Sequence, residues 1–320
     1  MTFIKKGAIA ITSTMIMAAM FLGCSEAYST SSLNKGSGIK VETSVYDKIN
    51  QTILGKESEI NKLIKTEYEL SILDKDKDGD LQVKVTIKNA YVKEEEDKKV
   101  KTEYHSISGL NITDPLASTT ATVYSAAVGE SFKVSLDKTG SVKMVEGSNE
   151  LLQKIMDKLK ISDTKIKNQI EAAAKEQFDE EALKGKVGDI IIKQIADKNV
   201  SSGDSWITEE PNPDDKSSTI KFTYKVSNTD GDICNVSISG KSDKDIKFED
   251  SLDNGSKLTY TGACEGTGDL VVDRKSGITS KANMLLKFKG NMEFKSGPKE
   301  LKGKKGTITM ERQVYVKIKK

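Results

Sequence analysis

Few side chains in this sequence could carry out catalysis, and their scarcity limits the chemistry that can be expected. One histidine (His105), one tryptophan (Trp206) and three cysteines (Cys24, Cys234 and Cys264) occur among 320 residues. A serine or cysteine nucleophile needs a neighbouring base, and a zinc site needs several nitrogen or sulfur ligands. His105 is therefore interpreted as a half-exposed polar residue on a strand. We expect no enzyme activity, no cofactor and no metal.

The segment Gly203-Asp204-Ser205 resembles the nucleophile block of one esterase family. That resemblance implies a later Asp-x-x-His motif, whereas His105 lies upstream and no histidine follows Trp206. We instead expect Gly203 to form a turn, Asp204 and Ser205 to bond local backbone, and Trp206 to anchor the following strands to helices. A hydrolase that uses carboxylates alone is a third alternative, because 48 acidic residues offer many pairs.

An acidic turn from Asp74 to Asp80 matches the start of an EF-hand loop, with Asp at alternate positions and Gly79 at the sixth. The twelfth position should be a bidentate glutamate and is Val85. Strand-like sequences flank the turn where helices should be. A hairpin turn is the favoured interpretation, and a weak Ca²⁺ site is the alternative.

The N-terminus has the pattern of an export signal. Lys5 and Lys6 precede an apolar stretch that is short for a membrane span. Phe21-Leu22-Gly23-Cys24 resembles the lipobox of bacterial lipoproteins, although Leu is usual at the Phe21 position. The resemblance implies a signal peptide at 1–23, a diacylglycerol on Cys24 and an extracytoplasmic chain anchored to a membrane. An ordinary secretory signal with a chance cysteine is the alternative.

The other two cysteines lie in alternating segments that predict strands. Cys234 shares a face with Val236, and Cys264 shares a face with Tyr260. Both thiols are therefore expected to face the core. An extracytoplasmic location permits a disulfide between Cys234 and Cys264, and two buried thiols are the alternative.

Hydrophobic periodicity divides the chain into regions. Serine, glycine and threonine after Cys24 predict a flexible tether over 24–40. Alternation predicts a first β region at 41–147 and a second at 200–320, and helical spacing predicts helices at 148–199. The acidic run from Glu94 to Asp97 is interpreted as a solvated loop.

The two β regions share turn motifs, which favours a duplication. Asp78-Gly79-Asp80 before one strand matches Asp230-Gly231-Asp232 before another, and 133–140 resembles 269–277. The predicted fold class is α+β, with mostly antiparallel β-sheet in two similar lobes and a central helical segment.

This order of hairpins, helices and a G-D-S-W motif at 203–206 resembles an uncharacterised family of bacterial lipoproteins with a domain of unknown function. The resemblance covers roughly 62–320 and implies a compartment and a fold, but no reaction. In outline the chain also resembles half-barrel lipoprotein carriers that hold acyl chains between a curved sheet and helices, which is a fold-level analogy.

Positive charge gathers at the C-terminus, although the whole chain carries only +2 and gives no reason to expect nucleic acid. We expect seven lysines to cluster around one turn and to contact anionic headgroups or wall polymers. They are Lys287, Lys289, Lys295, Lys299, Lys302, Lys304 and Lys305. Protection of an edge strand against aggregation is the alternative.

Apolar strand and helix faces are plentiful in this sequence and catalytic groups are scarce. The leading hypothesis is a membrane-anchored envelope lipoprotein that binds a hydrophobic or amphiphilic ligand between sheet and helices. The second is a structural or partner-binding envelope lipoprotein with a packed core.

Overall fold

A computed structural model describes residues 35–108, 116–137, 142–190, 200–211, 219–251, 256–273, 279–297 and 299–319. The predicted signal peptide, Cys24 and most of the predicted tether lie outside the described residues. The first strand begins at Gly38, inside the range expected for the tether.

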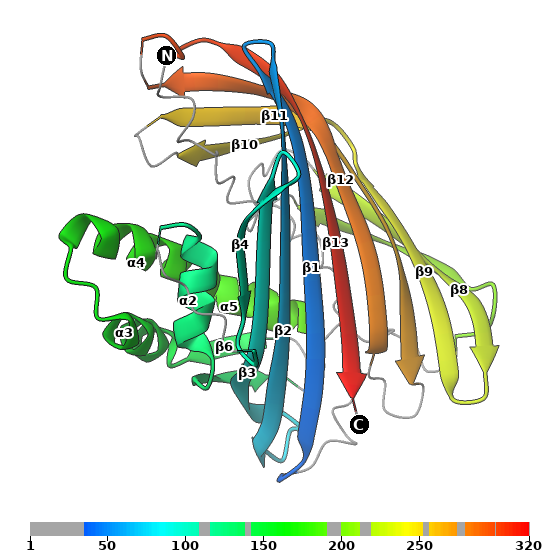
Figure 1. Cartoon of the computed structure of the whole chain (residues 1–320). Helices are drawn as coiled ribbons and strands as arrows, with labels where there is room; N and C mark the ends of the chain where they lie inside the picture. The colour runs from blue at the N-terminus through cyan, green and yellow to red at the C-terminus, as the bar shows by residue number, and fades with distance from the viewer. Residues whose placement is uncertain are drawn as a thin grey trace.

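Long antiparallel strands dominate the described chain (Figure 1). The first group is β1 (Gly38–Ile53), β2 (Lys56–Lys75), β3 (Leu81–Glu96), β4 (Lys99–His105), β5 (Ser131–Leu136) and β6 (Val142–Glu146). The second group is β7 (Ser205–Pro211), β8 (Thr219–Asp230), β9 (Ile233–Ser242), β10 (Ile246–Ser251), β11 (Lys257–Asp273), β12 (Thr279–Ser296) and β13 (Lys305–Lys319). The helices are α2 (Thr119–Ala127), α3 (Ser148–Leu159), α4 (Thr164–Phe178) and α5 (Glu180–Ile190).

All thirteen strands belong to one sheet, in the order β6-β5-β3-β2-β1-β13-β12-β11-β9-β8-β7. Strand β4 pairs with β3, and β10 pairs with β11. The two predicted β regions are therefore two halves of one sheet, joined where β1 pairs with β13 from Lys40↔Lys319 to Ile53↔Gly306. We call β1–β6 the first half, β7–β13 the second half and the β1–β13 pairing the seam.

The strand order fits a duplication, except that β4 pairs with β3, whereas β10, its counterpart by position in the chain, pairs with β11. The first half has the order β6-β5-β3-β2-β1, and the second repeats it as β12-β11-β9-β8-β7, with β13 between them. The Asp-Gly-Asp turns precede β3 and β9, which occupy equivalent places in this order. The α+β fold class and its antiparallel sheet are confirmed.

Alternation along the strands separates two faces of the sheet. One set of side chains is buried, as in β12, where Ala282, Met284, Leu286 and Phe288 alternate with exposed or half-buried residues. The sheet is curved, and the helices lie on the inside of the curve (Figure 1). We call the face that packs against α2 the inner face and the opposite one the outer face.

Side chains cap the starts of three described helices, including α5, where Asp179 Oδ1 accepts a hydrogen bond from Ala182 N at 2.8 Å. Asp163 accepts a hydrogen bond from Ile166 N at the start of α4, and Ser118 accepts one from Ala121 N at the start of α2. Helix α3 begins differently. Ser148 is the first helical residue, and Gly147 (φ +84°) precedes it without a side-chain cap.

Within the described residues, no helix is both long enough and apolar enough to cross a bilayer.

Candidate functional site

The first half of the sheet is closed by helices. Helix α2 lies between the sheet and helices α3 and α4, and its small side chains allow close packing. Ala121, Val123 and Ala127 are fully buried on it, as are Ile155 on α3 and Phe178 on α4. This part of the sheet–helix interface is therefore a packed apolar core.

A polar cluster joins helices α2, α4 and α5. Lys186 Nζ donates to Tyr124 Oη at 3.0 Å and to Gln177 Oε1 at 2.9 Å. The same ammonium lies 4.6 Å from the centre of the Phe178 ring. Complete burial raises the pKa of Tyr124 well above its ordinary value. The tyrosine is therefore neutral, and the cluster holds helices together rather than forming an acid–base pair.

The inner face of the second half differs in composition from the inner face of the first half. The described helices make their main sheet contacts with β3, β4, β5 and β6, all in the first half. The inner faces of β9, β11, β12 and β13 carry large apolar side chains and many glycines. The large residues include Met284, Leu286, Phe288, Met292, Ile308 and Met310, and the glycines are Gly240, Gly262, Gly266, Gly268, Gly290 and Gly306.

Side chains on neighbouring strands lie over several of these glycines. A Cβ atom added at Gly266 would stand 2.6 Å from Leu286 Cδ2, and one at Gly268 would stand 2.6 Å from Met284 Sδ. At Gly240 it would stand 2.4 Å from the Phe222 ring. Glycine is therefore required wherever the sheet curls and a neighbour covers the backbone.

Aromatic rings gather at one end of this face. Phe248 on β10 stacks on Tyr260 of β11, with ring centres 4.6 Å apart. It also meets Phe288 of β12 edge-on at 5.4 Å. Strand β10 pairs with the edge of β11, so these rings lie together on the inner face and extend the apolar surface.

Several polar atoms on the inner face, including the hydroxyl groups of Thr102 and Thr208, are buried without a hydrogen-bond partner among the described residues. Two of them belong to an amide group and an indole group. They are Gln51 Oε1, on β1 at the seam, and Trp206 Nε1, on β7. Gln51 uses its amide nitrogen to donate to Ser58 Oγ at 3.0 Å, and the Trp206 ring stacks on Tyr224. An unpaired buried polar atom costs about 1–3 kcal/mol, so each site would gain from a ligand that supplies the missing partner.

Charged residues cross the inner face at the seam. Arg312 on β13 donates to Asp47 on β1 through Nε at 2.6 Å and through a terminal nitrogen at 2.8 Å. The next pair along the row is Lys62–Glu94, at 3.4 Å, and Lys62 Nζ also donates to Thr120 Oγ1 of α2 at 2.6 Å. Glu94, Glu95 and Glu96 lie on β3, so the prediction of a loop is wrong for them, whereas Asp97 lies in the turn between β3 and β4. The opposite charges cancel along the row, which favours a structural role.

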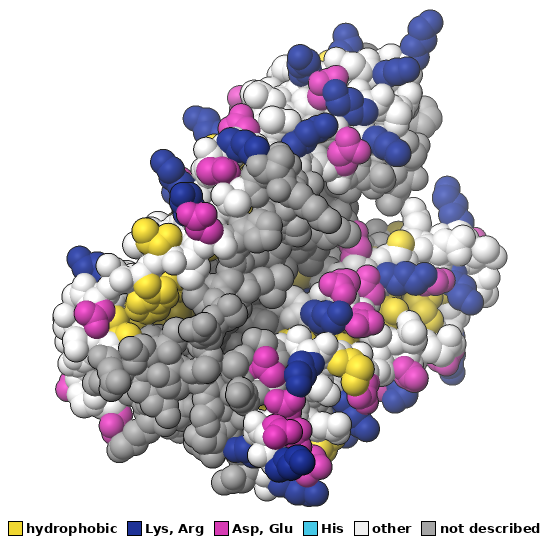
Figure 2. All heavy atoms as spheres, turned by 180° about the vertical axis from the view of Figure 1, so that it is seen from behind, with side chains coloured by type: hydrophobic (Ala, Val, Ile, Leu, Met, Phe, Trp, Pro, Cys, Tyr) yellow, Lys and Arg dark blue, Asp and Glu magenta, His cyan; other side chains and the backbone are white. Residues whose placement is uncertain are grey.

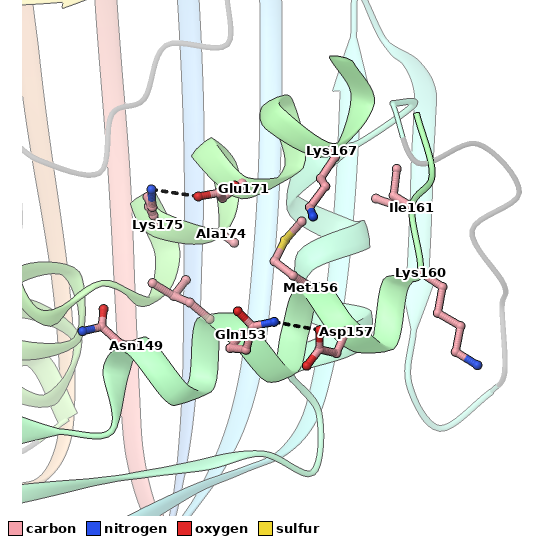
Figure 3. Close-up of a pocket in the computed structure, with 11 residues that line it drawn as sticks. Asn149, Gln153, Met156, Asp157, Lys160, Ile161, Lys167, Glu171, Ala174 and Lys175 are labelled. Atoms are coloured by element: carbon pink, nitrogen blue, oxygen red, sulfur yellow. Dashed lines mark hydrogen bonds and ion pairs between the residues drawn. The ribbon is translucent and has the colours of Figure 1, made fainter. Parts of the chain in front are cut away.

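A groove of about 500 Å³ lies between α3 and α4 (Figure 3). Met156 and Ala174 line it together with Lys167, and ion-paired or hydrogen-bonded side chains lie along its rim. Lys175 pairs with Glu171 at 2.9 Å, and Gln153 donates to Asp157 at 2.8 Å. The groove is on the solvent side of the helices and offers no nucleophile with a base.

The predicted disulfide between Cys234 and Cys264 is wrong, although both thiols are buried on neighbouring strands as expected. Cys234 stands opposite Val272 of β11, eight residues from Cys264 on that strand. At about 3.3 Å per residue, their separation is about 26 Å, far beyond the reach of a disulfide. Burial raises the pKa of Cys264 to about 12, with a smaller contribution from Glu265.

The G-D-S-W segment forms a structural turn. Gly203 has φ +96°, its N–H donates to Val226 O, and Asp204 accepts from Ser201 N at 2.7 Å. Ser205 begins β7, and Trp206 contacts Tyr224 with ring centres 5.2 Å apart. His105 ends β4 beside the Tyr91 ring and is half-buried. The histidine and the serine are on opposite halves of the sheet.

The acidic turn uses its carboxylates for its own geometry. Asp76 Oδ1 accepts from the backbone N–H groups of Asp78 and Asp80, and Asp80 pairs with Lys143. Within the described residues, no cluster of three histidine, cysteine or acidic side chains could hold a metal ion.

The seven C-terminal lysines do not form one cluster. Lys295, Lys299, Lys302, Lys304 and Lys305 surround the turn between β12 and β13. Lys287 and Lys289 lie on the outer face in the middle of β12, and Lys287 stands opposite Glu265 and Glu311 on the neighbouring strands. Five of the seven lysines therefore lie around one turn as predicted, and the other two, Lys287 and Lys289, do not.

Comparison with family models places this architecture in a family. Residues 78–279, more than half of the chain, match DUF6263, a family of unknown function. The chain belongs to this family. The match covers the helices and strands from both halves, which confirms the expected likeness to a family with a domain of unknown function. DUF6263 membership assigns no reaction, and the lipoprotein character stays a prediction.

Two solved structures match the chain weakly. A structure entitled "Lipid-protein interactions in lipovitellin" matches with a TM-score of 0.48 at 7% identity, over 90% of this chain and 25% of that one. The chain thus spans a quarter of that protein's length. An outer membrane channel from Pseudomonas putida F1 matches with a TM-score of 0.21 at 6% identity, over 92% of this chain and 100% of that one. Both TM-scores are below 0.5, so neither structure indicates what this chain binds. No curated protein matches the sequence.

Proposed function

We propose that this protein binds a hydrophobic or amphiphilic ligand on the inner face of the second half of its sheet. The chain is, in this proposal, an extracytoplasmic lipoprotein held to a membrane through Cys24, and it acts by binding rather than by catalysis. One observation carries the proposal. The described helices make their main sheet contacts with the first half, while the second half has an equally apolar inner face without such helix contacts.

The composition of this face suits an acyl chain. Glycines make parts of the surface smooth, and methionine side chains adapt their shape to irregular apolar partners. Each CH₂ group moved from water to such a surface contributes about 0.8 kcal/mol. A chain of ordinary lipid length therefore supplies enough apolar area for stable binding without any charged contact.

The unpaired polar atoms favour an amphiphile over a pure hydrocarbon. Gln51 Oε1 can accept a hydrogen bond from a hydroxyl group, and Trp206 Nε1 can donate one to a carbonyl or hydroxyl oxygen. They lie on β1 and β7, on opposite sides of β8–β13. A molecule with one polar group and a long apolar portion could satisfy either atom.

Native mass spectrometry of residues 25–320, exported to the periplasm, tests the proposal. We expect a copurified adduct with the mass of a lipid. A Met284→Gln/Met292→Gln variant places polar groups of similar size on the inner face and should lose the adduct. Met156→Gln makes the same change in the groove between α3 and α4 and should keep it.

Circular dichroism and a cooperative unfolding transition check that each variant folds. A clean protein mass that stays unchanged after incubation with envelope lipids would contradict the proposal. Loss of the adduct in Met156→Gln alone would move the site to the helices.

The second candidate function is a structural or partner-binding envelope protein. The packed interface between the first half and the helices favours it, because that part of the molecule is filled by its own side chains. A partner that copurifies in place of a lipid would support this function.

A further inference from the structure

One end of the sheet is rich in lysine and carries more positive than negative side chains. The turn between β1 and β2 and the turn between β12 and β13 lie side by side, because Ile53 pairs with Gly306. We call this region the lysine end. It comprises 54–57, Lys257 and the described residues of 293–305.

Lysines outnumber acidic residues in this region. Its lysines are Lys56, Lys257, Lys295, Lys299, Lys302, Lys304 and Lys305, and its acids are Glu57, Glu293 and Glu300. All seven lysines are exposed. Figure 2 shows dark blue side chains gathered at the upper end of the molecule.

Most lysines of this end lack an ion pair with a described residue, whereas several lysines on the strands have one. On the strands, Lys48 pairs with Glu59 at 2.9 Å and Lys221 with Glu209 at 2.8 Å. At the lysine end, Lys295 pairs with Glu293, and the other six have no ion pair with a described residue. Their charge is therefore available to an external anion.

An exposed apolar residue stands at the tip of the same end. Leu54 is 45% exposed and adopts a left-handed conformation (φ +53°) beside Gly55. A single exposed apolar residue is ordinary by itself, so Leu54 is informative only through its place beside the lysine-bearing turn. A leucine beside several lysines suits a bilayer, where the leucine reaches the acyl boundary and the lysines meet headgroups.

We infer that the lysine end docks on an anionic phospholipid bilayer. The surface is independent of the ligand proposed for the inner face, because its residues lie at the turns and not on that face. It also differs from the seven-lysine cluster expected from sequence, because it gains Leu54, Lys56 and Lys257 and loses Lys287 and Lys289.

The position of the lysine end constrains how the protein would sit on a membrane. Lys35 pairs with Asp74 at the opposite end of the sheet, and the sixteen residues of β1 separate the two ends by about 53 Å. Eleven residues from Cys24 to Lys35 reach at most about 40 Å. If one bilayer holds both the proposed anchor and the lysine end, the sheet must tilt rather than stand upright.

Flotation of residues 25–320 with vesicles tests the inference without the anchor, since this chain keeps every described residue. We expect binding to vesicles of equal parts phosphatidylglycerol and phosphatidylcholine, weak binding to pure phosphatidylcholine, and loss of binding at high salt. Lys302→Glu/Lys304→Glu should weaken binding at least about 25-fold, at about fivefold per lysine. Leu54→Ser should cause a smaller loss.

A matched control changes the same charge elsewhere on the same strand pair. Lys287→Glu/Lys289→Glu alters the outer face of β12 and should bind as the parent chain does. Equal losses in both double variants, or no binding by the parent chain, would overturn the inference. Binding to soluble polyphosphate that equals vesicle binding, with Leu54→Ser unaffected, would also overturn it in favour of a polymer.

Discussion

The two halves of this sheet share a strand order but bury their inner faces in different ways. In the first half, α2 lies directly on β3 and β4, and Ala121, Ile155 and Phe178 fill the space between layers. In the second half, glycines on β9, β11 and β12 let the strands curl and neighbouring side chains lie over them. The described helices cover one half and make no main contact with the other, although its large inner side chains are also buried.

This difference suggests how one sheet with a repeated strand order can serve two purposes. Packing against helices fixes the first half as a rigid core, because close-packed interiors tolerate little change in volume. In the second half, leucine, methionine and phenylalanine side chains lie over glycine backbone. We expect these side chains to change conformation more easily than those of the first half. The comparison predicts different responses to equivalent substitutions, and the largest effect should come from the seam that joins the halves.

Breaking the seam should cost the most stability. Arg312→Met leaves Asp47 buried without its bidentate partner, and removal of one member of a buried pair costs about 3–5 kcal/mol. Chemical denaturation should show this loss for Arg312→Met. Asp47→Leu combined with Arg312→Met should recover much of it. A single variant within about 1 kcal/mol of the parent chain would show that the halves do not depend on this pair.

Equivalent truncations in the two halves should differ. Phe178→Ala removes a fully buried ring from the helix-covered half and should cost about 3–5 kcal/mol. Met284→Ala on the inner face of the second half should cost about 2 kcal/mol. Added lipid should restore Met284→Ala and leave Phe178→Ala unchanged in thermal unfolding. Equal restoration of both variants, or of neither, would remove the distinction between the halves.

Overpacking the second half should have a moderate effect. Gly266→Ala brings a Cβ atom to 2.6 Å from Leu286 Cδ2 and should cost about 1–3 kcal/mol. Leu286→Val shortens the opposing side chain, so the double variant should lose less than the sum of the single variants. A double-mutant cycle in urea measures this coupling. Strict additivity would mean that the leucine does not lie over the glycine in solution.

The smallest effect concerns an ion pair that ties α3 to the first half. Lys158 Nζ lies 2.6 Å from Glu130 Oε1, and this hydrogen bond lowers the pKa of Glu130 from its ordinary 4.5. The stabilisation is complete above that ordinary value and is lost as pH falls through the lower folded value. Glu130→Gln should therefore cost less than about 1 kcal/mol at neutral pH and nothing in acid. A pH series of melting curves tests this, and a difference that grows in acid would contradict it.

Alternation in the sequence predicted most of the strands, because inner and outer residues differ in polarity along β5, β8, β9, β12 and β13. Helix α2 was missed, since Thr119 to Ala127 is short and buried on most sides and shows no clear polar face. The run from Glu94 to Glu96 was predicted to be a solvated loop because three successive glutamates are usually exposed to solvent. On the inner face, Lys62 satisfies Glu94 from a neighbouring strand.

The candidate site was less predictable than the fold. The seam depends on Asp47 and Arg312, which are 265 residues apart, and no local pattern connects them. The glycines were visible in the sequence, but only the register of β9, β11 and β12 shows that they share a face. The prediction of a disulfide between Cys234 and Cys264 was wrong for the same reason. Alternation predicted which face of the sheet each cysteine lies on, but not how far apart the two residues are along the strands.

The single tryptophan offers the most direct test of ligand binding to the second half. Trp206 stacks on Tyr224 at the β7 edge of the inner face, while the adjacent Ile207 is 65% exposed on the outer face. We would titrate delipidated protein with a brominated fatty acid, whose bromine quenches tryptophan at short range. The parent chain should be quenched saturably, whereas Trp206→Phe/Ile207→Trp, which moves the tryptophan to the outer face, should not. Equal quenching of both proteins, or none in the parent chain, would contradict a ligand on the inner face.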